Sequence, residues 1–430
     1  MPRTRRLATA ATAVVLGSTL GLTACAQDTG TPTLVWYINP DDGGQAQLAA
    51  QCTDEADGAY RITTSLLPRD AASQREQLAR RLAARDGSID LMSLDPPFIP
   101  ELAEAGFLAE MPAEVADAVS QDVVQGALDG ASWDGELVTV PFWANTQLLW
   151  YRVSVAEQAG LDMAQPVTWD QLIEATSGGD VTMAVQGAKA ESLTVWINAL
   201  VASAGGSIID DPSAEAADLT LGLDSEAGQE AAPVMREIGS PGPGGAGLPT
   251  ADEGANMATF QSARGSFMVN WPFVWTATLG AVEAGTLPDD LVEDIGWAMY
   301  PRVTEGTDAA PPYGGINLGV GAFSAPPDLA YQAAQCIVSP ENQAWYFTTN
   351  GNPPASTVAY DDPEVQETFP MADLIRDSLE QAVPRPQTPY YNEVSIGLQE
   401  TWHPVSGITE STPAVSADFI VAVLRGERLL

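Results

Sequence analysis

Predicted strands and helices alternate at the start of this chain, and this alternation limits the possible folds more than any other feature. Apolar runs rich in β-branched and aromatic residues at 33–38, 60–66 and 89–94 are typical of strands. Helical patterns follow these runs, at residues 45–52, 71–85 and 99–105. Strands that alternate with helices indicate βαβ units and a parallel sheet. The first part of the chain is therefore predicted to be an α/β lobe.

The length of 430 residues calls for more than this one lobe, since domains commonly span roughly 100–200 residues. The pattern changes after the first lobe. Residues 133–142 predict a hairpin that leads into the apolar stretch 144–152. A helix is predicted to begin after Thr168, which can cap it, with Asp170 in its first turn.

Charge and composition exclude several functions. The chain has 18 Lys and Arg against 57 Asp and Glu, a formal net charge of −39. Binding to nucleic acid depends on basic residues that neutralise phosphates, so nucleic acid is excluded as a partner. His403 is the only histidine, and the three cysteines lie far apart in the sequence. The sequence thus predicts no metal, no cofactor and no histidine-based catalytic triad.

The amino terminus has the layout of a secretory signal peptide in residues 1–24. Three arginines precede an apolar stretch at 7–22, and Leu22, Thr23 and Ala24 then lead to Cys25. This ending resembles a bacterial lipobox, which implies lipidation of Cys25, a short tether over 25–32 and a place on the outer face of the cell membrane. The alternative is a plain secretory signal with an incidental cysteine, and the export route is left open between the general and the twin-arginine pathways.

Cys52 and Cys336 are the two cysteines that remain once Cys25 is lipidated. Outside the cell an even pair is often a disulfide, and both residues lie in predicted helices, at 45–52 and 328–339. The alternatives are a bond between these helices and two buried free thiols that pack as small apolar groups.

Several stretches, in this order, resemble the extracellular solute-binding proteins of ABC importers, in the branch that takes sugars. They are residues 36–41, 141–152, 265–272, 339–343 and 351–354. The resemblance implies an α/β periplasmic-binding-protein fold of two lobes with a ligand cleft between them and several hinge crossings. It places one lobe at 33–144 plus 317–352 and the other at 145–312 plus 356–430. It also implies a monomer that binds its ligand without chemical change and delivers it to the transmembrane subunits of a permease.

A sugar needs polar partners for its hydroxyl groups and a flat aromatic surface for its apolar faces. The resemblance implies that Trp271 stacks on a sugar ring and that Gly315 presents backbone amides close to the ligand. The polar positions that match the family's ligand contacts are Asn39, Asp41, Asp95, Asn145, Glu253 and Arg385.

Each of these residues also has a structural interpretation. Asn39 and Asp41 can stabilise their own turn, and Asp95 can cap a helix. Asn145 can form a hinge hydrogen bond, and Arg385 can form a salt bridge. An acid such as Glu253 is common in a first helical turn, Trp271 can pack in the core as most tryptophans do, and Gly315 can be only a flexible crossing.

The predicted ligand is a small neutral saccharide. Residues 385–391 and 401–404 resemble the family members that bind trehalose, which makes trehalose or a related α-linked glucose disaccharide the first choice. Another oligosaccharide or a polyol is the alternative. Two other classes of protein remain: a glycoside hydrolase with Asp95 and Glu253 as paired carboxylates, and an adhesin or signalling lipoprotein with the same anchor.

Overall fold

The computed structural model describes residues 30–239 and 242–430. The chain divides into two units, Met1–Thr31 and Pro32–Leu430, and the second contains every helix and strand described below. The predicted signal peptide and Cys25 lie outside the described residues. Within the described part of the chain, no helix has the length and apolar character needed to cross a membrane.

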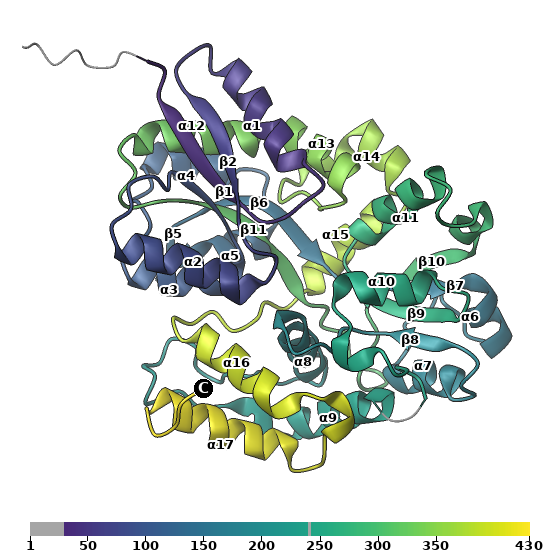
Figure 1. The fold of residues 1–430 in the computed structure, drawn as a ribbon. Helices are drawn as coiled ribbons and strands as arrows, with labels where there is room; N and C mark the ends of the chain where they lie inside the picture. Colours follow the sequence, from purple (N-terminus) through teal and green to yellow (C-terminus); the bar gives the residue numbers. More distant parts are fainter. Residues whose placement is uncertain (1–29, 240–241) are drawn as a thin grey trace, which may run out of the picture. The chain divides into compact units, whose positions relative to one another are not determined.

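The first sheet has five strands in the order β2-β1-β3-β11-β6 (Figure 1). Its members are β1 (Thr33–Ile38), β2 (Arg61–Leu66), β3 (Leu91–Leu94), β6 (Val140–Thr146) and β11 (Tyr313–Val320). The first three strands are parallel, as predicted, while β11 runs antiparallel to both β3 and β6. The α/β class predicted from the sequence is confirmed, and β11 enters this sheet from a distant part of the chain.

Side chains alternate across β1 and pack on helices at both faces of the sheet, as the two-residue period of a strand requires. Leu34, Trp36 and Ile38 pack with one set of helices, while Tyr37 packs with another. The first set is α1 (Gly44–Glu55), α4 (Ala113–Val119), α12 (Pro327–Ile337) and α13 (Pro340–Asn350); the second is α2 (Ala71–Ala83) and α3 (Ile99–Glu104). Both faces of the sheet are therefore covered.

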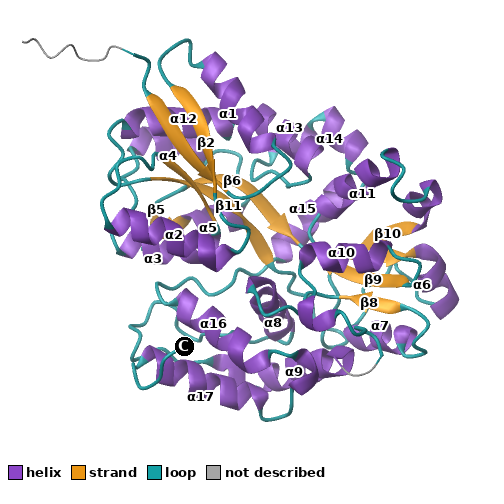
Figure 2. Ribbon diagram, in the orientation of Figure 1, coloured by secondary structure: helices purple, strands orange, loops and turns teal. Residues whose placement is uncertain are grey.

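The second sheet has four strands in the order β10-β7-β9-β8 (Figure 2). Its members are β7 (Leu148–Arg152), β8 (Thr182–Ala184), β9 (Gly265–Asn270) and β10 (Ile295–Ala298). Only Gln147 separates β6 of the first sheet from β7 of the second, so the chain crosses between the sheets there. The predicted hairpin is present only as the short pair β4 (Ser132–Trp133) and β5 (Glu136–Leu137), because the residues from Val140 onward join the first sheet.

A large helical core packs against the second sheet. It is formed mainly by α7 (Trp169–Thr176), α8 (Glu191–Ser203), α9 (Glu226–Gly239), α16 (Tyr391–Trp402) and α17 (Thr412–Leu424). Thr168 caps α7 as predicted: its hydroxyl accepts from the Gln171 N–H, and the Gln171 side chain accepts from the Thr168 N–H. The remaining helices are α5 (Gln125–Ala131), α6 (Val153–Ala159), α10 (Glu253–Gln261), α11 (Phe273–Glu283), α14 (Pro363–Thr368) and α15 (Ala372–Gln381).

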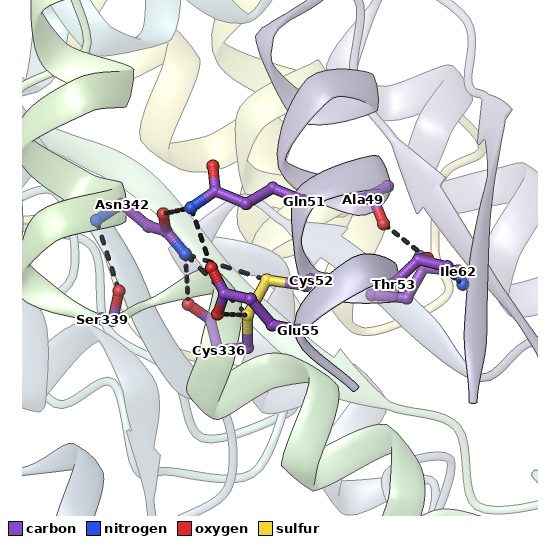
Figure 3. Close-up of a disulfide and its surroundings, with 9 residues drawn as sticks. All are labelled: Ala49, Gln51, Cys52, Thr53, Glu55, Ile62, Cys336, Ser339 and Asn342. Carbon is purple, nitrogen blue, oxygen red and sulfur yellow. Dashed lines mark hydrogen bonds between the residues drawn. A yellow bond between two sulfur atoms is a disulfide. The ribbon is translucent and has the colours of Figure 1, made fainter. Parts of the chain in front are cut away.

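A disulfide joins Cys52 of α1 to Cys336 of α12, with 5.9 Å between their Cα atoms (Figure 3). Asn342 forms hydrogen bonds to both helices next to the disulfide. Its Nδ2 donates to the Cys336 carbonyl at 2.7 Å, and its Oδ1 accepts from Gln51 Nε2 at 2.8 Å. The bond connects positions 284 residues apart in the sequence. The disulfide therefore connects α1, near the start of the first sheet, to α12, which follows β11 of the same sheet.

Candidate ligand-binding site

A cavity of about 560 Å³ lies between elements of the two sheets. The first sheet contributes residues that follow β1 and β3, together with parts of β6 and β11. The second sheet contributes the residue after β9, and three helices, α2, α8 and α10, begin at the cavity. Clefts beyond the carboxyl ends of parallel strands are the usual ligand sites of α/β proteins.

Seven of the eight predicted ligand contacts line this cavity, although they are spread over the sequence from position 39 to position 385. They are Asn39, Asp95, Asn145, Glu253, Trp271, Gly315 and Arg385. The eighth, Asp41, is not part of the lining.

Asp41 is hydrogen-bonded to neighbouring groups of the chain. Its carboxylate accepts from the N–H groups of Gly43, at 3.0 Å, and Gln45, at 2.8 Å, and from the hydroxyl of Tyr346 at 3.1 Å. These bonds stabilise the turn before α1, which was the structural interpretation of this residue. Asp41 is thus the predicted contact that lies outside the cavity lining, and its bonds fit the structural interpretation.

Arg385 is buried, with its side chain 4% exposed, and lies between two carboxylates. Its Nη1 donates to Asp95 Oδ2 at 3.0 Å and to Glu191 Oε1 at 2.7 Å, and its Nη2 donates to Asp95 Oδ1 at 2.5 Å. Asp95 follows β3 of the first sheet, whereas Glu191 is the first residue of α8. The arginine thus connects groups from the two sides of the cavity, and its Nε has no hydrogen-bond partner among the described residues.

Burial and charge set the protonation of this cluster. Burial raises the pKa of Glu191 even though Arg385 opposes the shift, and Tyr391 and Ser395 donate hydrogen bonds to the same carboxylate. Burial alone would lower the pKa of Arg385, but Asp95 and Glu191 hold it well above its usual value. Arg385 therefore stays charged.

Glu253 presents a carboxyl group of a different kind. It is the first residue of α10, whose start is capped by Asp252, with Asp252 Oδ1 accepting from the Ala255 N–H at 2.8 Å. Burial raises the pKa of Glu253, and the nearby charges of Asp252 and Glu191 add to this shift. Its carboxyl group also accepts a hydrogen bond from its own backbone N–H, which opposes the rise in pKa.

Trp271 is one of the aromatic residues of the lining and lies close to β11, which carries two glycines there. A Cβ on Gly314 would lie 2.9 Å from the Trp271 ring, so the ring rests directly on this strand. Gly315 has a φ of 136°, and a Cβ there would lie 2.2 Å from the Trp143 carbonyl oxygen. Side chains at either position would push into the aromatic ring or the neighbouring strand.

Asn145 lies on β6 opposite Gly314, next to the crossing from β6 to β7. It is 7% exposed, and its Oδ1 accepts from the Thr146 N–H at 3.0 Å. This residue therefore belongs both to the crossing and to the cavity lining.

Sequence reasoning missed several lining residues. Glu191 is the most important, and its only signal was an acid at the start of an apolar helix. The others include Arg69, Asp70, Gln74, Trp143 and Asn352, which lie in a helix start, a strand and a loop. The described residues include no group of three or more His, Cys, Asp or Glu side chains that could hold a metal ion.

Comparison with known proteins identifies the family of this chain. Residues 60–344 match the family described as bacterial extracellular solute-binding protein. A curated relative, the mannitol-binding protein of Pseudomonas aeruginosa, is 28% identical over 162 residues, which are 38% of this chain and 36% of that protein. The match thus spans about a third of the relative's length.

Two solved structures share the fold over almost the whole chain. Maltose-bound MalE3 of T. maritima has a TM-score of 0.78 and 22% identity, and the match covers 92% of this chain and all of that one. UgpB of Mycobacterium tuberculosis, in complex with glycerophosphocholine, has a TM-score of 0.73 and 18% identity, with 93% of this chain and 100% of that one covered. These likenesses confirm the predicted two-lobe binding-protein fold. The chain belongs to the bacterial extracellular solute-binding proteins, a family of binding proteins and not of enzymes.

Proposed function

We propose that this protein is the substrate-binding component of an ABC importer and that its cavity captures a small neutral polyhydroxylated solute. The observation that carries the proposal is a pair of polar atoms without a hydrogen-bond partner, on residues that line the same cavity as an aromatic ring. Arg385 Nε and Asn39 Oδ1 are buried without a hydrogen-bond partner in the described part of the chain, and Trp271 lines the same cavity. One atom needs an acceptor and the other a donor, and a hydroxyl group supplies both.

The charge of the cavity favours a neutral ligand over an anionic one. Five carboxylates and two guanidinium groups line it, so its formal charge is 2 − 5 = −3. Arg385 is already paired with two of the carboxylates. The charged lining residues are Arg69, Asp70, Asp95, Glu191, Asp252, Glu253 and Arg385.

Helix starts often bind anions, but here the chain's own acids occupy them. Asp70 caps α2, Asp252 caps α10, and Glu191 and Glu253 are the first residues of α8 and α10. A phosphate or carboxylate would face these groups, and of the two lining cations Arg385 is already paired with carboxylates while Arg69 is exposed to solvent. For this reason we prefer a sugar or polyol, such as the maltose or mannitol named for related proteins, to an anion such as glycerophosphocholine's phosphodiester.

Trehalose, or a related α-linked glucose disaccharide, is our first choice within this class. This choice rests on the resemblance of residues 385–391 and 401–404 to trehalose-binding members of the family. Another oligosaccharide or a polyol is the alternative. A glycoside hydrolase is disfavoured by the family, and also by Asp95, because both of its carboxylate oxygens accept from Arg385.

We further propose that the protein is a monomer, anchored through lipid on Cys25 to the extracytoplasmic face of the membrane, where it passes its solute to the permease subunits. Only a few residues separate Cys25 from β1, so a folded binding domain would follow a short tether. The lobe boundaries are part of this proposal: 33–144 with 317–352, and 145–312 with 356–430. The strands of the first sheet reach slightly beyond them, to Thr146 and back to Tyr313.

Ligand-dependent unfolding of the purified chain tests the function. A ligand at 100 times its dissociation constant adds about 2.7 kcal/mol to the free energy of unfolding, which raises the melting temperature by a few degrees. We expect such a shift with trehalose, or else with maltose or mannitol, and none with glycerophosphocholine; the sugar should be recovered intact by chromatography. A shift with glycerophosphocholine alone, or cleavage of the sugar, would refute the proposal.

A further inference from the structure

Asn270 is a buried polar residue at the end of β9, directly before Trp271, and it does not line the cavity. We propose that Asn270 is a positioning residue for the ligand site: its amide holds Glu253 and Trp271 in the places from which they meet the solute. This inference rests on the proposed function, since it concerns how the same cavity is organised.

The Asn270 side chain connects two separate elements of the lining. Its Nδ2 donates to the Glu253 carbonyl oxygen at 3.0 Å and to Asn256 Oδ1 at 2.9 Å. Its Oδ1 accepts from the Trp271 N–H at 2.9 Å. One buried amide therefore binds the first turn of α10 and the backbone that leaves the second sheet.

The connection matters because neither partner is fixed by regular structure alone. Glu253 is the first residue of its helix, and Trp271 is the first residue beyond its strand. Their side chains enter the cavity from these two ends, so a shift of either backbone moves a carboxyl group or an aromatic ring relative to the ligand. Binding groups need to be held to within about 0.5 Å by supporting hydrogen bonds, and Asn270 makes such bonds to both.

The side chain at this position has to donate and accept at once. Asparagine does both, leucine of similar size does neither, and a carboxyl group accepts when ionised and keeps a single donor when protonated. Asn256 Nδ2 has no partner among the described residues, so the Asn256 amide can turn and donate to an aspartate at 270. Asn270→Asp therefore keeps the acceptor for the Trp271 N–H and loses at least one of the two donated bonds, whereas Asn270→Leu removes both connections.

Gln186 offers a matched control. It is fully buried, its Nε2 donates to the Val269 carbonyl at 2.9 Å, and its Oε1 accepts from Gln147 at 3.3 Å. It thus bonds to the residue just before Asn270, but it does not line the cavity and contacts neither Glu253 nor Trp271 through these bonds. Gln186→Leu removes a comparable buried amide from the same sheet.

Isothermal titration calorimetry with trehalose, or with whichever neutral solute binds the wild type best, tests the inference on the full chain. We expect Asn270→Leu to weaken affinity by about tenfold or more, Asn270→Asp by a smaller factor, and Gln186→Leu by less than about twofold. If Asn270 only stabilised the fold, Asn270→Leu would weaken the ligand affinity by the same factor in every background. We therefore also expect the effect of Asn270→Leu to shrink to less than about twofold in a chain that already carries Glu253→Gln and Trp271→Ala.

The outcomes separate this inference from the proposed function. If the wild type binds a neutral solute and Asn270→Leu binds it equally well, the positioning role is wrong and the function stands. The role is also wrong if Asn270→Leu keeps its full effect in the doubly substituted background. If Asn270→Leu does not fold, Asn270→Asp decides the question in the same way. A wild type that binds no neutral solute refutes both.

Discussion

Replacing Arg385 with methionine tests the buried charge cluster most directly. Methionine keeps an apolar stem of similar reach but leaves Asp95 and Glu191 without their counter-charge. Removing one partner of a buried ion pair costs about 3–5 kcal/mol. The Asp95 side chain is 17% exposed and that of Glu191 is 11% exposed, so both carboxylates can recover some hydration in the variant. We therefore expect a loss in the free energy of unfolding at the lower end of this range, about 3 kcal/mol at neutral pH.

The loss should depend on pH in a defined direction. Burial already raises the pKa of Glu191 above that of the unfolded chain, and removal of Arg385 raises it further. A carboxyl group with a raised folded pKa stabilises the fold below its unfolded pKa, and that contribution is lost as pH rises through the folded value. The difference between variant and wild type should therefore be largest near about pH 8 and smaller near about pH 5.

Urea unfolding followed by circular dichroism measures this difference. Arg376→Met is the matched control, since Arg376 pairs with Asp373 at the surface, with side chains 39% and 71% exposed, and should cost less than about 1 kcal/mol. Adding Asp95→Asn and Glu191→Gln to Arg385→Met should recover most of the loss. A loss below about 1 kcal/mol at neutral pH, or one that does not shrink in acid, would refute the reasoning.

Three further predictions concern the disulfide and the cavity. Cys52→Ser with Cys336→Ser should lower the free energy of unfolding by about 2–5 kcal/mol, because the bond closes a loop of 284 residues; calorimetry showing an unchanged melting temperature would contradict this. Trp271→Ala should weaken sugar affinity by about 2 kcal/mol, or about 30-fold, in titration calorimetry, and equal affinity would remove the stacking role. Burial raises the pKa of Glu253, and its ionised form accepts hydrogen bonds from hydroxyl groups, so the affinity for the sugar should fall as pH drops through that raised pKa. Glu253→Gln should abolish this pH dependence, and a wild type with constant affinity from about pH 8 to pH 4.5 would contradict the prediction.

Local patterns predicted the first lobe well because they depend on neighbouring residues. The runs that became β1, β2 and β3 combine strand-forming residues with nearby helical periodicity, and the cap at Thr168 needs only a hydroxyl and a glutamine three residues later. The later hairpin was predicted less well. Residues from Val140 onward pair with β11, about 170 residues further along, and no local pattern reports such a partner.

The candidate site shows the same division. Asp41 and Arg385 both matched the family's ligand positions, but only Arg385 lines the cavity. A carboxylate in a turn can also accept from its own backbone, and the sequence does not distinguish this role from ligand binding. The contacts of Asp41 with Gly43, Gln45 and Tyr346 support the turn role. Glu191 was not predicted as a site residue, because an acid in a first helical turn is common in any sequence. In the structure it is one of the two carboxylates that pair with Arg385, the other being Asp95.

The sequence by itself determined the class of this protein: an α/β chain, strongly acidic, with polar and aromatic residues in the order typical of extracellular solute-binding proteins. The tertiary structure decided which of these residues meet. Asp95, Glu191 and Arg385 come from three distant segments, and Asn270 acts through Glu253 and Trp271. Secondary structure is encoded by residues a few positions apart, whereas a ligand site depends on long-range packing that brings the ends of separate strands and helices to one cavity.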